Sequence, residues 1–443
     1  METQIKLENV STVQKKFSIT IPAGKVSQVV ERKFAEAQKT AKIKGFRPGK
    51  VPINMVKQYY KEEVQQNALN SLINETYNEA LKKHTLRIVG EPQIEGTTEK
   101  EKLFITEGKD LSYVAMVEVV PEVDPKDYKG LAIEKPSAEV TSDDIEKLKH
   151  NLLDRKAEMT PVVRVAKVGD FVEFKYEGKL KTDKGMESQP NLSGDRSAEI
   201  GSGQLIPEFE ANIVGLKAGE SKNFKMTYAK DFTDANLAGK DAEYTIDVRE
   251  VKEKILPAFT EELVKEFGYE SLTDFDKKSN EMLTKNKAEE SDNMLRNNMI
   301  EALIAKNPIE VPQSLVYSQM RALADDYSQE LKRYGFNDQM VQSAVVSQLQ
   351  DFKKRAETQV RAGILLDAIS KKDKIEPKAA DIEAEMLKMA TNFGVELKTL
   401  KDRFEHNPRD KSNFEYRVRE ELTIQSILGA AKISAAKVEK KKK

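Results

Sequence analysis

The sequence predicts a multidomain α+β chain in three successive parts: an α+β region, a small antiparallel β region and an extended all-α region. Alternating apolar residues followed by helical spacing indicate the first part, and short alternating segments between glycine-bearing turns indicate the second. Long helical patterns fill the third. The chain has 443 residues, which is enough for about three domains of ~150 residues each. We therefore expect domains at 1–120, 161–254 and 255–443, with a helix-bearing connector at 121–160.

The composition is typical of a globular protein with a strongly polar surface. Apolar residues make up 39% and charged residues 33% of the chain, and the mean hydropathy is −0.61. No segment approaches the ~20 apolar residues of a membrane-spanning helix, and the first residues lack the pattern of a secretory signal. The absence of cysteine excludes disulfides and thiolate chemistry. We expect a cytoplasmic protein that does not contact the membrane.

Cofactor chemistry finds no support in the sequence. The three histidines, His84, His150 and His406, lie far apart and show no HExxH or similar metal-binding spacing. No glycine-rich phosphate loop and no GxSxG motif is present. We therefore expect no metal, no nucleotide cofactor and no catalytic triad.

The first region reads as a strand followed by two helices and further strands. Phe17, Ile19 and Ile21 alternate with polar residues, which predicts a half-buried strand. Helical spacing then runs over 26–41. Pro52 suits the first position of a second helix, because the missing N–H has no cost there. We expect that helix to reach Lys83, and further strands near 87–89 and 113–119.

A basic loop separates the two predicted helices, with the sequence Gly45-Phe46-Arg47-Pro48-Gly49-Lys50-Val51-Pro52. Residues 32–61 contain nine Lys and Arg against one acidic residue, a local charge of 9 − 1 = +8. Phe46 with Arg47 and Lys50 offers an apolar anchor flanked by cations, which suits an anionic partner. An ordinary turn with one buried phenylalanine explains the same residues equally well, so chemistry alone leaves both interpretations open.

The loop resembles the G-F-R-x-G-K-x-P signature of the bacterial trigger factor family, ribosome-associated chaperones, and the resemblance extends over the whole chain in domain order. It implies that the loop meets the large ribosomal subunit beside the polypeptide exit, and that the clients are nascent and unfolded polypeptides. It leaves open whether free molecules form a homodimer off the ribosome. Some family members carry lysine where this chain has Pro48, which implies a smaller electrostatic share of docking here. The implied ribosome-binding residues are Gly45, Phe46, Arg47, Pro48, Gly49 and Lys50.

The middle region predicts a small antiparallel sheet, with apolar alternation at 172–176, 224–228 and 244–248. Its segment 204–210 resembles the part of FKBP-type prolyl isomerases that places an aromatic ring at the floor of the pocket. The resemblance implies that Phe209 is the floor, and that Leu205, Ile206, Tyr176, Phe232 and Tyr244 surround it. Met186 and Glu187 stand where that family commonly has phenylalanine and an acid. We therefore expect weaker or altered isomerase activity.

The connector and the last region are predicted to be helical. Thr141 and Asp144 form a capping-box pattern for a helix ending near Lys156. Seven of the 13 methionines lie in 256–443, and methionine suits surfaces that bind many apolar sequences. The trigger factor resemblance implies that these helices form arms around nascent chains. We expect helices at 260–267, 272–306, 313–334, 337–373, 379–393, 397–405 and 411–432.

The leading hypothesis is therefore a ribosome-associated chaperone that also catalyses cis–trans isomerisation of X–Pro bonds. The main alternative is the same pair of activities exerted off the ribosome on free unfolded proteins. A folding catalyst of the cell envelope would require an export signal, which the sequence does not show. A nucleic-acid-binding protein would explain residues 32–61, but neither the aromatic pocket nor the methionine-rich helices.

Overall fold

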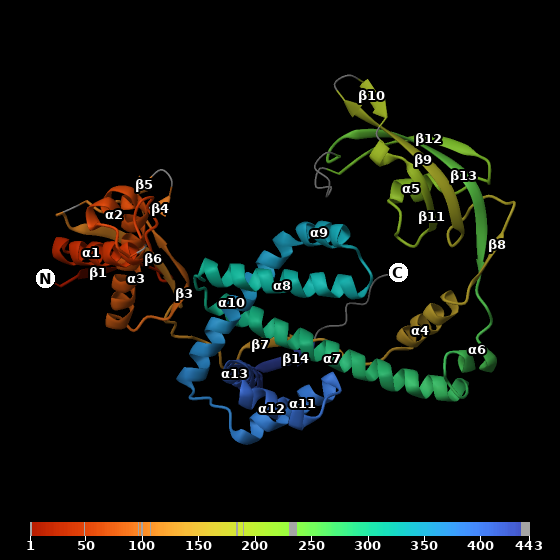
Figure 1. Ribbon diagram of the computed structural model, residues 1–443. Helices are drawn as coiled ribbons and strands as arrows, with labels where there is room; N and C mark the ends of the chain where they lie inside the picture. The colour runs from red at the N-terminus through yellow and green to blue at the C-terminus, as the bar shows by residue number, and fades with distance from the viewer. Residues whose placement is uncertain are drawn as a thin grey trace. The chain divides into compact units, whose positions relative to one another are not determined.

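The computed structural model divides into two compact units, residues 1–137 together with 292–443, and residues 138–291. Within the described residues, no helix combines the length and the apolar character that a membrane crossing requires. Figure 1 shows the succession of elements along the chain. The structure describes residues 2–47, 49–95, 97–98, 101–106, 108–182, 185–188, 190–229 and 237–435.

The first region is a four-stranded antiparallel sheet of order β1-β2-β6-β3, against which helices α1 and α3 pack. Phe17, Ile19 and Ile21 of β2 are all buried, which confirms the predicted alternation. The elements are β1 (Gln4–Asn9), β2 (Gln14–Ile21), α1 (Ala23–Thr40), α2 (Ile53–Tyr59), α3 (Lys61–Lys83), β3 (Ile88–Ile94), β4 (Thr97–Thr98), β5 (Glu101–Lys102) and β6 (Leu111–Val119).

The single helix expected over 52–83 is wrong, because the chain breaks at Tyr60 into α2 and α3. The backbone of Tyr60 has φ −118° and ψ 17°, outside the helical region. Its hydroxyl lies 3.3 Å from both the backbone nitrogen and the backbone oxygen of Lys42. Tyr60 therefore interrupts the helix, and its hydroxyl contacts the chain just before the basic loop. Helical spacing in the sequence does not reveal such a tertiary contact.

Residues 138–291 contain the second sheet and helix α5, which packs on it. The predicted capping box is confirmed, since Thr141 and Asp144 exchange side-chain and backbone hydrogen bonds at the start of α4. Strand β9 pairs with β10, β11 and β13, and β13 also pairs with β12 and β8. The elements are α4 (Ser142–Asp154), β8 (Glu158–Pro161), β9 (Phe171–Thr182), β10 (Gly185–Ser188), the 3-10 helix η1 (Pro190–Leu192), β11 (Gly194–Glu199), α5 (Pro207–Ile213), β12 (Ser221–Thr227), β13 (Asp241–Ile255), α6 (Glu261–Glu266) and the first part of α7 (Leu272–Lys306).

The last region is helical, as expected, and a short parallel pair of strands, β7 and β14, joins its end to the segment after the first sheet. The continuous helix expected over 337–373 is wrong. The backbone of Gln348 has φ −99° and ψ 0°, which separates α9 from α10 and lets Phe352 meet Tyr327 of α8 with ring centroids 5.6 Å apart. The elements are β7 (Ala132–Lys135), α8 (Gln313–Arg333), α9 (Asp338–Ser347), α10 (Leu349–Lys372), α11 (Ala379–Phe393), α12 (Leu397–His406), α13 (Pro408–Ala430) and β14 (Lys432–Ala435).

Strand β9 requires a glycine at position 178, because two side chains approach its backbone closely. A Cβ atom there would lie 2.6 Å from Cε1 of Tyr244 and 2.7 Å from Cβ of Leu192, both well inside contact distance. The neighbouring Gly194 is different, since a Cβ atom there would lie 3.4 Å from the hydroxyl of Tyr176, an ordinary contact. Gly178 therefore sets how closely Tyr244 and Leu192 approach the sheet.

We expect Gly178→Ala to destabilise this sheet by about 1–3 kcal/mol, because overpacking forces the surrounding side chains to shift. Hydrogen exchange of β9 and β13 in the full chain should then accelerate roughly fivefold to a hundredfold. Gly194→Ala is the matched control and should leave exchange almost unchanged. Equal protection in the two variants would contradict the steric argument.

Candidate functional site

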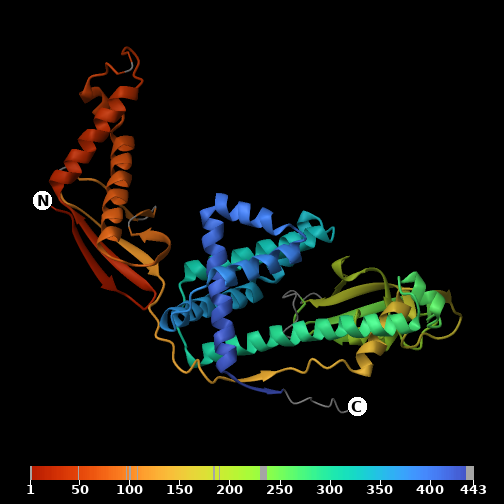
Figure 2. The ribbon, with the colours of Figure 1, turned by 90° about the horizontal axis from the view of Figure 1, so that it is seen from below.

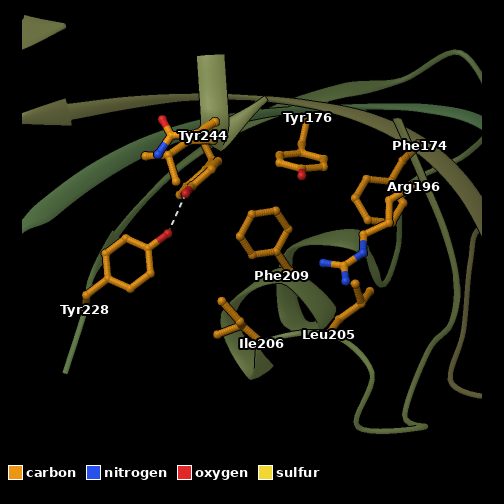
Figure 3. Close-up of a pocket in the computed structure, with 10 residues that line it drawn as sticks. Phe174, Tyr176, Arg196, Leu205, Ile206, Phe209, Tyr228 and Tyr244 are labelled. Carbon is orange, nitrogen blue, oxygen red and sulfur yellow. Dashed lines mark hydrogen bonds between the residues drawn. The ribbon is translucent and has the colours of Figure 1, made fainter. Parts of the chain in front are cut away.

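A pocket of about 130 Å³ lies on the face of the second sheet, between the sheet and α5. Strand parity explains its position, because Phe174 and Tyr176 of β9 point to the same face as Tyr244 of β13. Figure 3 shows the aromatic rings gathered around this space. The lining residues are Phe174, Tyr176, Asn191, Leu192, Arg196, Leu205, Ile206, Phe209, Tyr228 and Tyr244.

Phe209 lies in the centre of this group and is brought there by the first turn of α5. Pro207 occupies the first turn of the helix, which suits a residue without an N–H. The ring of Phe209 meets those of Tyr176 and Tyr244 at centroid distances of 5.9 and 4.8 Å, with interplanar angles of 87° and 65°. Such edge-to-face contacts are favourable for aromatic rings. They fix the ring of Phe209 as an apolar surface that is 7% exposed.

The segment before α5 is held in place by a polar contact from the helix. The backbone N–H of Gly201 donates to the carboxylate of Glu210 over 3.1 Å. The backbone N–H of Phe209 donates to the carbonyl of Ile206 over 2.8 Å. These bonds fix both ends of the turn that carries Leu205 and Ile206, so these two side chains line the pocket beside Phe209.

Two tyrosine hydroxyls supply the polar atoms on the opposite side of the pocket. The hydroxyls of Tyr228 and Tyr244 are 2.5 Å apart and share a buried hydrogen bond. Burial, together with this bond, raises the pKa of Tyr244 above its ordinary value. The hydroxyl of Tyr244 therefore stays protonated, and it serves as a neutral hydrogen-bonding group.

The structure brings together five of the six residues that the sequence singled out for this pocket: Tyr176, Leu205, Ile206, Phe209 and Tyr244. The sixth, Phe232, lies outside the described residues. Met186 and Glu187 belong to β10, and neither lines the pocket. Sequence reasoning missed five lining residues. Tyr228 and Phe174 lie in the segments predicted as strands but were not linked to the pocket, whereas no local pattern marked the others. The missed residues are Phe174, Asn191, Leu192, Arg196 and Tyr228.

The basic loop is a second, quite different site at the end of a helical hairpin. Figure 2 shows it at the tip where α1 and α2 meet, at the far end from the sheet. Gly45 and Gly49 have φ values of 95° and 79°, which other residues rarely adopt. Phe46 is 41% exposed, so the interpretation as a turn around a buried phenylalanine is wrong.

The cations of this loop are exposed to solvent, whereas the end of the loop is anchored to the rest of the domain. Among the described residues, the side chains of Arg47 and Lys50 have no hydrogen-bond or ion-pair partner, and both are exposed. Val51, at the end of the loop, is fully buried, and its carbonyl accepts a 2.7 Å hydrogen bond from the side chain of Gln38. Pro48 lies outside the described residues. The loop thus presents an apolar ring and two exposed cations from an anchored turn.

The helical region presents large apolar side chains to solvent on α8 and α9 and at the turn between them. Tyr334 is 74% exposed, although aromatic residues of this size are usually buried in part. The seven methionines of this region differ in exposure: Met299 and Met386 are buried, Met320 and Met389 are half-buried, and Met282, Met294 and Met340 are exposed. The exposed apolar residues of this stretch are Tyr317, Tyr334, Phe336, Met340 and Val346.

Comparison with known proteins places these features in one family. The family model described as bacterial trigger factor protein matches residues 3–152, and the model of its C-terminus matches residues 271–429. The model of FKBP-type peptidyl-prolyl cis-trans isomerases matches residues 163–249, which include the aromatic pocket.

Whole-length relatives agree with these domain matches. A trigger factor of Citrifermentans bemidjiense is 34% identical over 436 residues, covering 97% of this chain and 98% of the relative. That of Geobacter sp. strain M21 is 34% identical over 435 residues, with the same coverage. That of Bdellovibrio bacteriovorus is 32% identical and covers 96% of both chains. The chain therefore belongs to the trigger factor family of ribosome-associated chaperones and carries an FKBP-type peptidyl-prolyl cis-trans isomerase domain.

Proposed function

We propose that the aromatic pocket around Phe209 is the site of prolyl isomerisation. The observation that carries this proposal is the apolar ring of Phe209, held edge-on by Tyr176 and Tyr244 at the centre of the pocket. Leu205 and Ile206 form one wall. Phe232, outside the described residues, is part of the proposal by its place in the sequence.

An apolar pocket is suited to this reaction because no bond to a nucleophile or metal is required. Rotation about the X–Pro bond is opposed by a barrier of ~18–20 kcal/mol, which comes from amide resonance. The twisted transition state has less charge separation than the planar amide. Apolar surroundings therefore favour it relative to the ground state, and the catalytic gain is one of differential binding. Phe209, at the floor of the pocket, would contact one face of the proline ring.

We expect Phe209→Ala and the milder Phe209→Leu to lower kcat/KM for isomerisation of an X–Pro peptide by at least roughly tenfold, because either change removes the aromatic floor. Exchange spectroscopy on a short peptide measures the rate without a coupling protease. Val163→Ala, at an exposed position of the same sheet domain, is the control. Equal rates for wild type and Phe209→Leu would remove this pocket from the reaction.

We further propose that the basic loop docks on the large ribosomal subunit near the polypeptide exit. Phe46 supplies apolar contact, and the exposed cations of Arg47 and Lys50 meet phosphate or carboxylate groups. The fixed turn reduces the conformational entropy lost on docking. This partner places the protein in the cytoplasm, beside emerging chains.

The parts of the chain are proposed to divide the work. Residues 1–120 dock, residues 161–254 isomerise, and residues 255–443 hold clients, with 121–160 as the connector. Exposed side chains such as Tyr334 and Phe336 support the holding role, since apolar surface of this kind binds unfolded segments. Without a client, the same surface favours association of two free molecules. We therefore propose that the protein can form a homodimer off the ribosome.

Replacing Phe46, Arg47 and Lys50 together by alanine should abolish most co-sedimentation with ribosomes, because both the anchor and its flanking cations are lost. The matched control replaces Phe104, Lys82 and Lys109, which are also exposed and lie in the same region. Binding by the wild type should also weaken as salt rises. A triple loop variant that pellets like the control would favour the alternative, in which the protein works on free unfolded chains.

A further inference from the structure

Arg196 is the single charged side chain among the described residues that line the aromatic pocket. Arg196 lies on β11, opposite Phe174 of β9. Ala198, two residues later on β11, lies opposite Val172. Ala198 is buried in the core, and residues two apart on a strand share a face. Strand parity therefore directs Arg196 toward the pocket, and Figure 3 shows its guanidinium beside Leu205.

Within the described residues, the guanidinium of Arg196 has no structural partner. In the described part of the chain it makes no hydrogen bond or ion pair, and the residue is exposed. The adjacent acid, Asp195, is already paired with Arg249 over 2.8 Å. Several other cations of this domain are paired internally, as where Lys252 pairs with Glu173 over 2.6 Å. Among the described lining residues, Arg196 is thus the one cation, and it lies exposed at the rim of the pocket.

The size of the pocket determines which part of a substrate would meet this cation. A volume of about 130 Å³ is well below the roughly 300–1,000 Å³ of sites for drug-sized ligands. The pocket has room for a small ring, such as that of proline, while the side chains flanking the proline stay at the rim. Arg196 lies at that rim, on the side away from the Tyr228–Tyr244 pair.

We propose that Arg196 selects X–Pro bonds in which a carboxylate side chain directly flanks the proline. The inference rests on the proposal that this pocket is the isomerase site. A guanidinium and a carboxylate form two parallel hydrogen bonds, a geometry that lysine cannot reproduce. Because the site is open to solvent, the gain is modest, corresponding to roughly a two- to fivefold preference. A flanking lysine is disfavoured by the same charge.

The test compares peptides that differ only in the residue before or after the proline, using glutamate, glutamine, leucine and lysine. Catalysed rates are measured by exchange spectroscopy and divided by the uncatalysed rate of the same peptide. For the wild type we expect a glutamate-to-glutamine ratio in kcat/KM of roughly two to five on at least one side of the proline. This ratio should fall toward one at high salt.

Three variants and a control make the result specific. Arg196→Gln should bring the ratio to about one, Arg196→Lys should keep part of it, and Arg196→Glu should reverse it in favour of lysine. In Arg196→Gln, the rate with the glutamate peptide should fall more than the rate with the leucine peptide. Lys217→Gln removes another exposed cation of the domain that does not line the pocket, and it should leave all ratios as in the wild type.

The outcomes separate this inference from the proposal on which it rests. If Phe209→Leu leaves every peptide rate unchanged, the pocket is not the site. If Phe209→Leu slows all peptides but Arg196→Gln leaves the glutamate preference intact, only the inference about Arg196 is overturned. An equal loss for glutamate, glutamine and leucine peptides in Arg196→Gln would also overturn it, because such a residue would act without regard to charge.

Discussion

The isomerase domain depends on the close packing of side chains against strand β9. This strand pairs with three others, and it contributes Phe174 and Tyr176 to one face. Two residues after Tyr176, position 178 cannot carry a side chain on this face. A Cβ atom there would lie within 2.7 Å of atoms of Tyr244 and Leu192. One glycine therefore lets a second strand bring its tyrosine over the sheet. That tyrosine in turn holds the ring of Phe209.

The two proposed sites differ in how their binding surfaces are held in place. In the pocket, the rings around Phe209 are largely withdrawn from water and fix one another, so the surface is ready before a substrate arrives. In the loop, Phe46 stays exposed in the free protein, and its order comes from the glycine turns and the buried Val51. A surface that must meet a large partner cannot be buried in advance. The loop therefore relies on a stiff backbone where the pocket relies on packing.

The sequence predicted these features unequally. The alternation at Phe17, Ile19 and Ile21 and the capping box at Thr141 were recognisable because both signals are local. The helix breaks at Tyr60 and Gln348 were missed, since each depends on a contact with a distant segment. The same distinction holds in the pocket. Phe209 and its neighbours were found through a motif, whereas Leu192 reaches the pocket from the 3-10 helix η1 and Arg196 through the pairing of β11 with β9.

A cation in an isomerase pocket would be unfavourable at the floor and is tolerable at the rim. At the floor, a charge would have to be desolvated, and it would stabilise the polar planar amide more than the less polar twisted one. Arg196 avoids both costs because β11 places it where water still reaches the guanidinium. An attraction for a flanking carboxylate that is equal in the planar and twisted forms would strengthen binding without changing the barrier. On this proposal Arg196 changes which substrates are bound, and the proposed aromatic floor controls the barrier to rotation.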